Sequence, residues 1–205
     1  MLTEHGHNNE LLTERLSLRR PTPEDIDAIL SIHGDPRACE HNPSDALASR
    51  EEVETLFVRW DEHWTHYGFG YWVVCYRGWA RPAGFCGLKV MLFRERTVLN
   101  LLYRFDPAVW SNGLATEAAT AVVAWAGKHQ PQHPVIARVR PTNTASARVA
   151  VRAGLTRAEN LDGPGYDGHD LIFIFPERHY RPLFGSEWRS EGPGDRYSAP
   201  NGGHE

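Results

Sequence analysis

The sequence predicts one mixed α/β or α+β domain built around a central β-sheet. Segments with the alternating pattern of strands and segments with the pattern of helices follow one another in the order β α α β β β α β α β β. Of the 205 residues, 41% are hydrophobic, which is enough to bury one sizeable core. No linker or internal repeat divides the chain between Leu11 and Phe184. The elements therefore belong to a single folding unit.

The two ends of the chain differ in composition from the middle. Residues 185–205 are rich in Gly, Pro and Ser, and residues 1–10 contain no apolar run. Such segments bury too little apolar surface to offset the entropy lost on ordering. We expect a domain over residues 11–184, flanked by tails at 1–10 and 185–205.

The first predicted elements are a strand and a helix. Residues 15–20 (RLSLRR) alternate apolar and polar side chains, as in a half-buried strand, and Pro21 ends the run. A helix follows over 22–33, because the segment PEDI places a proline and two acids in its first turn, where the helix dipole favours negative charge.

A second helix follows a loop rich in Pro, Asp and Asn at residues 34–46. Ser49 and Glu52 have the spacing of a capping box, and apolar residues recur at helical spacing to about Tyr67.

Three aromatic or β-branched runs divided by turn residues come next, at 71–76, 82–92 and 97–105. They predict an antiparallel meander. The remaining elements are helices at 114–128 and 144–153 and strands at 135–140, 155–159 and 171–175.

Charge and cysteine content exclude several classes of protein. The formal net charge of −4 gives no overall attraction to nucleic acid or anionic membranes. Lys89 and Lys128 are the only lysines, so nearly all basic residues are arginine. Three scattered cysteines predict no disulfide framework and favour a reducing compartment, the cytoplasm. No run approaches the roughly 18 apolar residues of a membrane span.

Two sequence patterns resemble ligand sites, but the residues around them do not fit such sites. His63 and His66 are spaced as a metal pair, but no third ligand lies nearby, so we expect no metal. Gly163, Gly165 and Gly168 form a literal G-x-G-x-x-G, yet the run leads into a strand where a dinucleotide motif requires a helix. We assign that run to a hairpin loop.

The segment DPAVWSNGLATEA after Phe105 is the best candidate for an anion site. Gly113 allows close approach of a ligand, and the helix start at Thr116 supplies free N–H groups and partial positive charge. A pyrophosphate fits such a site. An ordinary Asn-Gly turn explains the same residues and stays open as the alternative.

Three stretches in order carry a family resemblance: LLTERLSLRRPTPEDIDAI, YRFDPAVWSNGLATEAATAVVAWA and RPTNTASARVAVRAGL. With them, Leu11 to Phe175 resembles the GNAT superfamily of CoA-dependent N-acetyltransferases, most of all its ribosomal-protein N-terminal acetyltransferase (Rim) branch. The resemblance implies a GNAT fold, with a mostly antiparallel, twisted sheet of about seven strands, splayed middle strands and four helices. It also implies acetyl-CoA as cosubstrate.

The resemblance places the pantetheine arm of CoA between strands 97–105 and 135–140, and the pyrophosphate on the following loop and helix start. Trp110 stands where many relatives carry Gln or Arg, so one cationic contact is missing. Alternative roles stay open for three of the residues below: Asn143 as the cap of the helix at 144–153, and Arg148 and Arg152 as solvated residues of that helix. The implied cofactor-binding residues are Phe105, Trp110, Ser111, Asn112, Gly113, Leu114, Ala115, Thr116, Asn143, Arg148 and Arg152.

The implied catalytic residues are Ser146, Asn100 and Tyr103. Ser146 matches the serine of the Rim branch near the thioester sulfur, since the tyrosine that many relatives use is Ala150 here. Asn100 stands three residues before Tyr103, where relatives often carry a glutamate base. Backbone N–H groups of residues 102–105 are the oxyanion candidates.

An enzyme with a weak base suits an α-amine, because that group is far less protonated at pH 7 than a lysine. We expect a peptide or protein N-terminus as acceptor, with a small amine such as an antibiotic or polyamine as alternative. Glu40, His41 and Asp45 are candidate proton acceptors in the loop at 34–46. A CoA-binding module without catalysis is the second hypothesis, and the chain is expected to be a monomer or homodimer that binds no nucleic acid or membrane.

Overall fold

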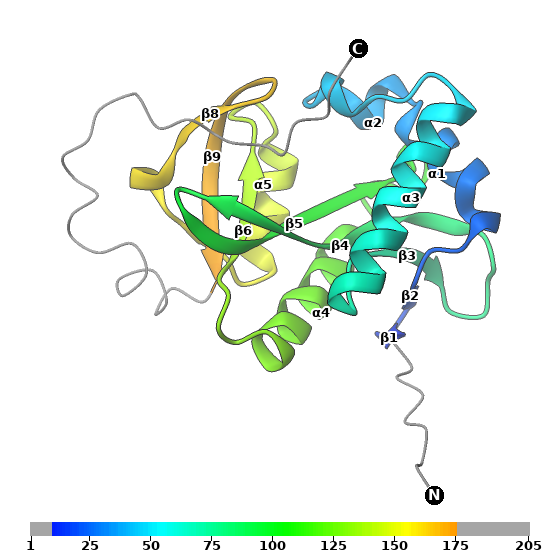
Figure 1. The fold of residues 1–205 in the computed structure, drawn as a ribbon, viewed down its shortest axis with the longest axis horizontal. Coiled ribbons are helices and arrows are strands. Elements are labelled where there is room, and N and C mark those ends of the chain that lie inside the picture. Colours follow the sequence, from blue (N-terminus) through cyan, green and yellow to red (C-terminus); the bar gives the residue numbers. More distant parts are fainter. Residues whose placement is uncertain (1–9, 176–205) are drawn as a thin grey trace, which may run out of the picture.

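The computed structural model describes residues 10–175, which form a nine-stranded sheet with helices on both faces (Figure 1). The strand order is β1-β2-β3-β4-β5-β6-β9-β7, and β8 pairs with β9. The strands are β1 (Leu11–Leu12), β2 (Leu16–Arg19), β3 (Tyr71–Tyr76), β4 (Pro82–Phe93), β5 (Arg96–Phe105), β6 (Val135–Val139), β7 (Thr156–Arg157), β8 (Gly163–Gly165) and β9 (Gly168–Phe175).

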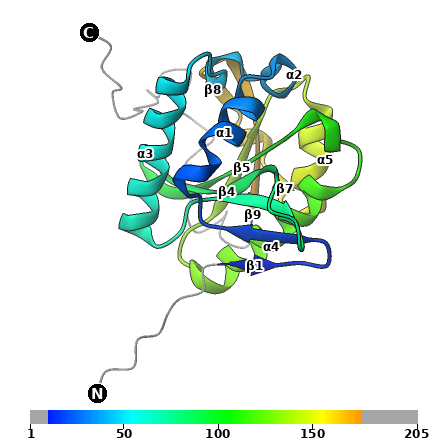
Figure 2. The ribbon, with the colours of Figure 1, turned by 90° about the vertical axis from the view of Figure 1, so that its right-hand side faces the viewer.

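Helices α1 and α3 cover one face of the sheet, and α4 and α5 cover the other (Figure 2). The α-helices are α1 (Ile26–His33), α2 (Pro36–Cys39), α3 (Arg50–Tyr67), α4 (Leu114–His129) and α5 (Thr144–Arg152). Short 3-10 turns are η1 (Pro23–Asp25), η2 (Pro43–Asp45), η3 (Pro107–Val109) and η4 (Glu159–Leu161).

Strand alternation explains the two layers. In β3, Val73 packs with α1 and α3, whereas its neighbours Trp72 and Val74 belong to the core under α4. Successive side chains of a strand point to opposite faces, so the apolar run YWVVCY supplies both cores at once. The resulting sheet is buried on both sides where these helices lie.

The predicted order of strands and helices is confirmed, including the antiparallel meander β3-β4-β5. The capping box of Ser49 and Glu52 also forms, with the Ser49 side chain accepting from Glu52 N. The segment at 163–168 forms the β8–β9 hairpin, in line with the hairpin loop expected there.

The structure adds elements that the sequence pattern missed. The expected count of about seven strands becomes nine, because β1 has only two residues and β8 is Gly-Pro-Gly, neither of which shows a strand pattern. The loop at 34–46 contains the short helix α2, and the strand expected at 155–159 stops at Arg157 and turns into η4. Within residues 10–175, no helix has the length and apolarity to cross a membrane.

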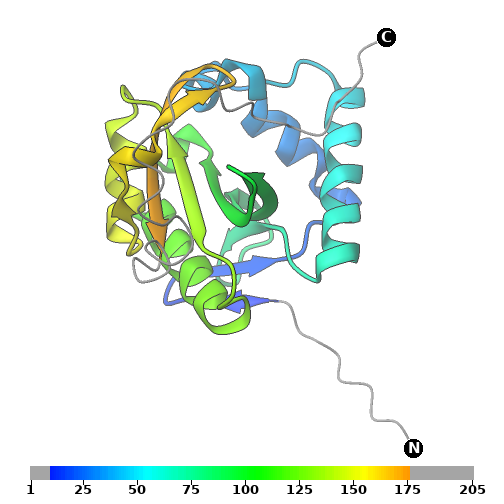
Figure 3. The ribbon, with the colours of Figure 1, turned by 60° about the vertical axis from the view of Figure 1, so that its left-hand side comes forward.

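The predicted splay of the middle strands is confirmed. β5 and β6 run parallel and pair at only two positions, Leu99 with Val135 and Asn100 with Ile136. By contrast, β4 and β5 pair along ten positions, and β6 pairs with β9 along five. Each middle strand therefore follows its own long partner, and Figure 3 shows β6 running beside β9 and away from the end of β5.

Candidate active site

The end of β5 beyond the splay presents different side chains to the two faces of the sheet. Tyr103 points to the α4 and α5 side, where it reaches α5. Asn100 and Arg104 point to the α1 and α3 side, where Arg104 contacts α1. One strand thus contributes polar groups to two separate chemical environments on either side of the gap.

On the α5 side, Tyr103 and Ser146 form a hydrogen-bonded pair. The Tyr103 hydroxyl donates to the Ser146 carbonyl oxygen at 2.8 Å and lies 2.9 Å from Ser146 Oγ. Burial raises the pKa of Tyr103, and the hydrogen bond to Ser146 only partly opposes this. With Tyr103 donating to the carbonyl, Ser146 Oγ is left to donate to the phenol oxygen. The sequence brings these two residues together only through the contact of α5 with β5.

Asn143 positions Ser146 by capping α5. Its Oδ1 accepts a hydrogen bond from Ser146 N at 2.9 Å, the ordinary Asx cap. The Asn143 side-chain NH₂ group remains available to a ligand. Ala150, at the position of the tyrosine of many relatives, is fully buried.

The loop after β5 has the backbone shape of an anion cradle. Ser111 and Gly113 both have positive φ, 65° and 74°, and Gly113 is the N-cap of α4. Because glycine has no side chain, it leaves the first N–H groups of α4 uncapped. Trp110 folds back so that its Nε1 donates to Phe105 O at 2.9 Å. The uncapped start of α4 fits a pyrophosphate.

Arg15 supplies a cation to this loop, a contact that the sequence analysis missed. Its Nη1 donates to Asn112 O at 2.9 Å, and its Nε donates to Glu117 Oε2 at 2.6 Å. Its Nη2 lies 3.6 Å from the position that a Cβ on Gly113 would take. Thr13 also hydrogen-bonds Glu117, so Glu117 ties the β1–β2 turn to α4. Arg15 is visible in the segment TERL, but its partners Asn112 and Glu117 lie about a hundred residues later in the sequence.

The positions of the two expected arginines on α5 give them no contact with this loop. Arg148 is exposed, and its Nη1 donates to Thr144 Oγ1 on its own helix at 3.4 Å. Arg152 is also exposed, and together with Arg148 it lines a shallow depression on the outer surface of α5. Their use by a ligand remains a prediction.

On the α1 and α3 side, Asn100 lies beside Tyr71 and Lys89. Asn100 is paired with Lys89 across β4 and β5, so the two side chains share one face. Its side chain hydrogen-bonds Tyr71, whose pKa is raised because burial outweighs that bond. Asn100 Oδ1 is buried and has no hydrogen-bond partner among the described residues. This oxygen can accept a hydrogen bond from a ligand.

Arg104 links three elements beside Asn100. Its Nη2 contacts Asp45 Oδ2 at 2.8 Å, and its Nη1 donates to His33 Nδ1 at 2.9 Å. Burial, reinforced by the Arg104 charge, lowers the pKa of His33 to about 3, so His33 is neutral at pH 7. Of the candidate proton acceptors, Asp45 is thus held in an ion pair, while His41 contacts Thr142.

The loop at 34–48 and the β8–β9 hairpin meet on this side of the sheet. Ser44 donates to Asp167 through its backbone N–H at 3.1 Å and through its hydroxyl at 2.7 Å. Arg140 contacts Asp170 at 2.7 Å and donates to Gly168 O at 2.6 Å. The loop at 34–48 and the β8–β9 hairpin are therefore joined through polar contacts.

Residues 10–175 contain no cluster of His, Cys, Asp and Glu that could hold a metal ion. His63 lies 2.8 Å from Phe69 O through Nδ1, and its Nε2 accepts from Val90 N at 3.0 Å. Both ring nitrogens thus attach α3 to neighbouring backbone, which is a structural use of this histidine.

Comparison with known proteins identifies the same fold and family. Residues 15–156 match the Acetyltransferase (GNAT) domain family. The uncharacterized protein YkkB of Bacillus subtilis is 27% identical over 156 residues, which span 74% of this chain and 88% of YkkB. The crystal structure of an acetyltransferase from Agrobacterium tumefaciens is 26% identical, with a TM-score of 0.69 over 81% of this chain and 93% of that one.

A ribosomal-protein acetyltransferase has the same fold. RimL, a ribosomal L7/L12 α-N-protein acetyltransferase in complex with coenzyme A, superposes with a TM-score of 0.63 at 16% identity, covering 80% of this chain and 95% of RimL. RimL and this chain therefore share one fold.

The buried His33 predicts a specific pH dependence of stability. Its folded pKa of about 3 lies below the unfolded value of about 6.5, so the folded state loses stability as the pH falls from 6.5 towards 3. Between pH 7 and pH 4.5 protonation of this group in the unfolded state lowers the free energy of unfolding by about 2.5 kcal/mol. Urea unfolding of His33→Gln should show a correspondingly smaller loss of stability, and His66→Gln, a replacement of an exposed histidine on α3, is the control variant. An unchanged slope in His33→Gln would contradict the assignment.

Proposed function

The chain belongs to the GNAT acetyltransferase family and is an N-acetyltransferase, and we propose that it acetylates the N-terminal α-amine of a peptide or protein, using acetyl-CoA. The proposal places the reaction in the cytoplasm, since all three cysteines are free thiols. The observation that favours this acceptor is the identity of residue 100.

Asn100 lies on the α1 and α3 side of β5, which we call the acceptor face. Its amide side chain cannot take up a proton. Its unpartnered Oδ1 can only orient an amine by accepting a hydrogen bond. The neighbouring groups are no better as bases, since Asp45 is ion-paired with Arg104 and His33 has a pKa of about 3. An α-amine is about 10% neutral at pH 7, whereas a lysine is about 0.04% neutral. The site thus suits an amine that needs little help to lose its proton.

On the other side of the gap, the α4 start and its loop bind the cosubstrate. The uncapped N–H groups of Leu114, Ala115 and Thr116 face the pyrophosphate, and Arg15, held in an ion pair by Glu117, brings its Nη2 donor beside Gly113. The unpaired edge of β5 from residue 101 to 105 offers backbone groups to the pantetheine amides and to the carbonyl oxygen of the thioester. Acetyl-CoA supplies the activated acetyl group.

The Tyr103–Ser146 pair stabilises the departing thiolate by hydrogen bonding. A thiol has a pKa near 8.5 and a tyrosine near 10, and burial raises the pKa of Tyr103 further. Full proton transfer from Tyr103 to the thiolate is therefore uphill. When the thioester is bound, one hydroxyl hydrogen of the pair turns from its partner within the protein to the sulfur atom. That hydrogen bond stabilises the negative charge that develops on sulfur, and solvent completes the protonation.

Small-amine acetylation is the alternative acceptor class. An aminoglycoside acetyltransferase and a spermidine N-acetyltransferase have the same fold as this chain. A CoA-binding protein without catalysis is the third possibility, motivated by Asn100 and Ala150 in place of acid–base residues.

A direct screen separates these functions. The full chain is incubated with acetyl-CoA and a panel of N-terminal peptides, lysine side-chain peptides, polyamines and aminoglycosides, and products are identified by mass spectrometry. We expect acetylation of peptide α-amines above the rate of thioester hydrolysis. Preferential acetylation of polyamines or aminoglycosides would overturn the acceptor, and tight CoA binding with no product from any amine would favour the binding module.

Gly113→Val should weaken CoA binding at least about tenfold. A β-branched side chain is strained at φ 74° and projects into the space beside Arg15 where the pyrophosphate is placed. Gly68→Val is the matched control, because Gly68 caps α3 with the same φ of 74° and ψ of 6°. Calorimetry should show wild-type affinity in Gly68→Val. Equal affinities in both variants would refute the placement of the pyrophosphate.

Ser146→Ala and Tyr103→Phe should each lower kcat by about 10- to 100-fold, the value of one hydrogen bond to a charged group. The dissociation constant for CoA should stay within about threefold, since neither hydroxyl faces the α4 start. Steady-state kinetics and calorimetry on the same preparations measure both quantities. A parallel loss of affinity would make these residues part of the binding site only.

A further inference from the structure

The acceptor face of the sheet carries an excess of positive charge centred on Lys89. Lys89 lies directly across from Asn100 in the β4–β5 ladder and remains accessible to solvent. Cross-strand partners on one face have side chains about 5 Å apart at Cβ, so Lys89 stands next to the group that would orient the amine. One of only two lysines in the chain is therefore at the acceptor position.

The carboxylates on this face are already neutralised by arginines. Asp45 pairs with Arg104 at 2.8 Å, and Asp170 pairs with both Arg138 and Arg140 at 2.6 and 2.7 Å. Asp167 lies 3.9 Å from Arg140 and accepts two hydrogen bonds from Ser44. These three acids are thus committed to partners within the protein.

Lys89 has no such partner. Among the described residues neither Lys89 nor Arg59 forms an ion pair or a side-chain hydrogen bond. Burial and the charge of Arg59 lower the pKa of Lys89, and only the charge of Asp45 opposes them. Lys89 is therefore stabilised by a negative charge that arrives with a ligand.

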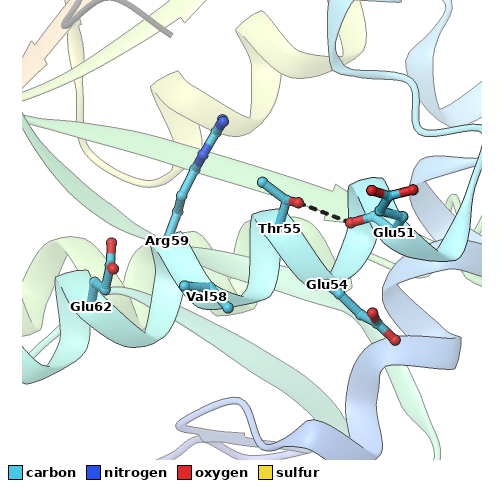
Figure 4. A pocket seen from close by; sticks show the side chains of 6 residues that line it. All are labelled: Glu51, Glu54, Thr55, Val58, Arg59 and Glu62. Atoms are coloured by element: carbon cyan, nitrogen blue, oxygen red, sulfur yellow. Dashed lines mark hydrogen bonds between the residues drawn. The ribbon is translucent and has the colours of Figure 1, made fainter. Parts of the chain in front are cut away.

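Arg59 lies near carboxylates of α3, which offset its positive charge. The positive charge without a negative partner is therefore that of Lys89. Glu51, Glu54 and Glu62 line the same groove along α3 (Figure 4). Figure 4 also shows Arg59 and Glu54 pointing to opposite sides of the helix. Arg59 thus lies among three carboxylates of α3, whereas Lys89 beside Asn100 has no carboxylate partner among the described residues.

We propose that the amine acceptor carries a carboxylate close to its reacting amine, and that Lys89 binds this carboxylate beside Asn100. The inference rests on the proposed function and narrows it to peptides with acidic residues directly after the N-terminus. Polycationic amines are disfavoured, because a second positive charge beside Lys89 adds repulsion and the described carboxylates of the strand face are already paired with arginines.

Three peptides of equal length test the proposal. Each begins with the same N-terminal residue, and the second and third residues are Asp-Asp, Asn-Asn or Lys-Lys; spermidine serves as the polycation. CoA release gives kcat/KM, and calorimetry in the presence of CoA gives the affinity for each acceptor. For the wild type we expect the Asp-Asp peptide to exceed the Lys-Lys peptide at least about tenfold in both quantities.

Lys89→Met should reduce the preference for Asp-Asp over Asn-Asn to about twofold or less, whereas Lys89→Arg retains most of it. Lys128→Met is the control, since Lys128 is the other lysine and is exposed in the last turn of α4. A preference for Lys-Lys or spermidine, or an unchanged preference in Lys89→Met, would overturn the proposal.

Failure of the proposed acetyltransferase function and failure of the proposed role of Lys89 give different results in this experiment. If the wild type acetylates none of the amines, the proposed function fails, and the calorimetric preference among the peptides still decides whether Lys89 binds a carboxylate. If the wild type acetylates peptides without regard to their charge, the acetyltransfer stands and the role of Lys89 is refuted.

Discussion

The short pairing between β5 and β6 is the constraint on which the site depends. Two ladder positions hold the strands together, and beyond Asn100 each strand stays with its other neighbour. A fully paired β5 would have no backbone edge to offer a ligand. Because antiparallel partners on the outer sides satisfy both strands, the sheet remains stable while one edge of each stays available in its middle.

The functional groups around the gap between β5 and β6 come from elements that are far apart in the sequence. α4 brings the uncapped start at Gly113, the β1–β2 turn brings Arg15, and α5 brings Ser146. The Glu117 carboxylate holds the first two together, accepting hydrogen bonds from both Thr13 and Arg15. A guanidinium group is thereby placed at the loop, paired with Glu117, although Trp110 replaces the usual basic residue. The positioning of charge depends on this one carboxylate.

The alternation of β5 separates the leaving group from the acceptor. Tyr103 faces α5 and is available to a sulfur atom, whereas Asn100 faces the opposite side with Lys89 and Tyr71. Neutral and positive groups dominate the acceptor side, since its acids are bound to arginines and His33 is uncharged. Under the proposed function, orientation and electrostatics on this side take the place of the carboxylate base of many relatives.

The sequence by itself determined the order of elements, the capping of α3 and the meander, because these follow from local periodicity and from motifs of contiguous residues. The family resemblance, carried by three such motifs, implied the splay. It also located the loop at Gly113. It did not reveal β1, β8, the contact of Arg15 with Asn112 or the pairing of Lys89 with Asn100. Those features depend on strand register and on contacts between residues far apart in the chain, which only the packing of the folded sheet decides.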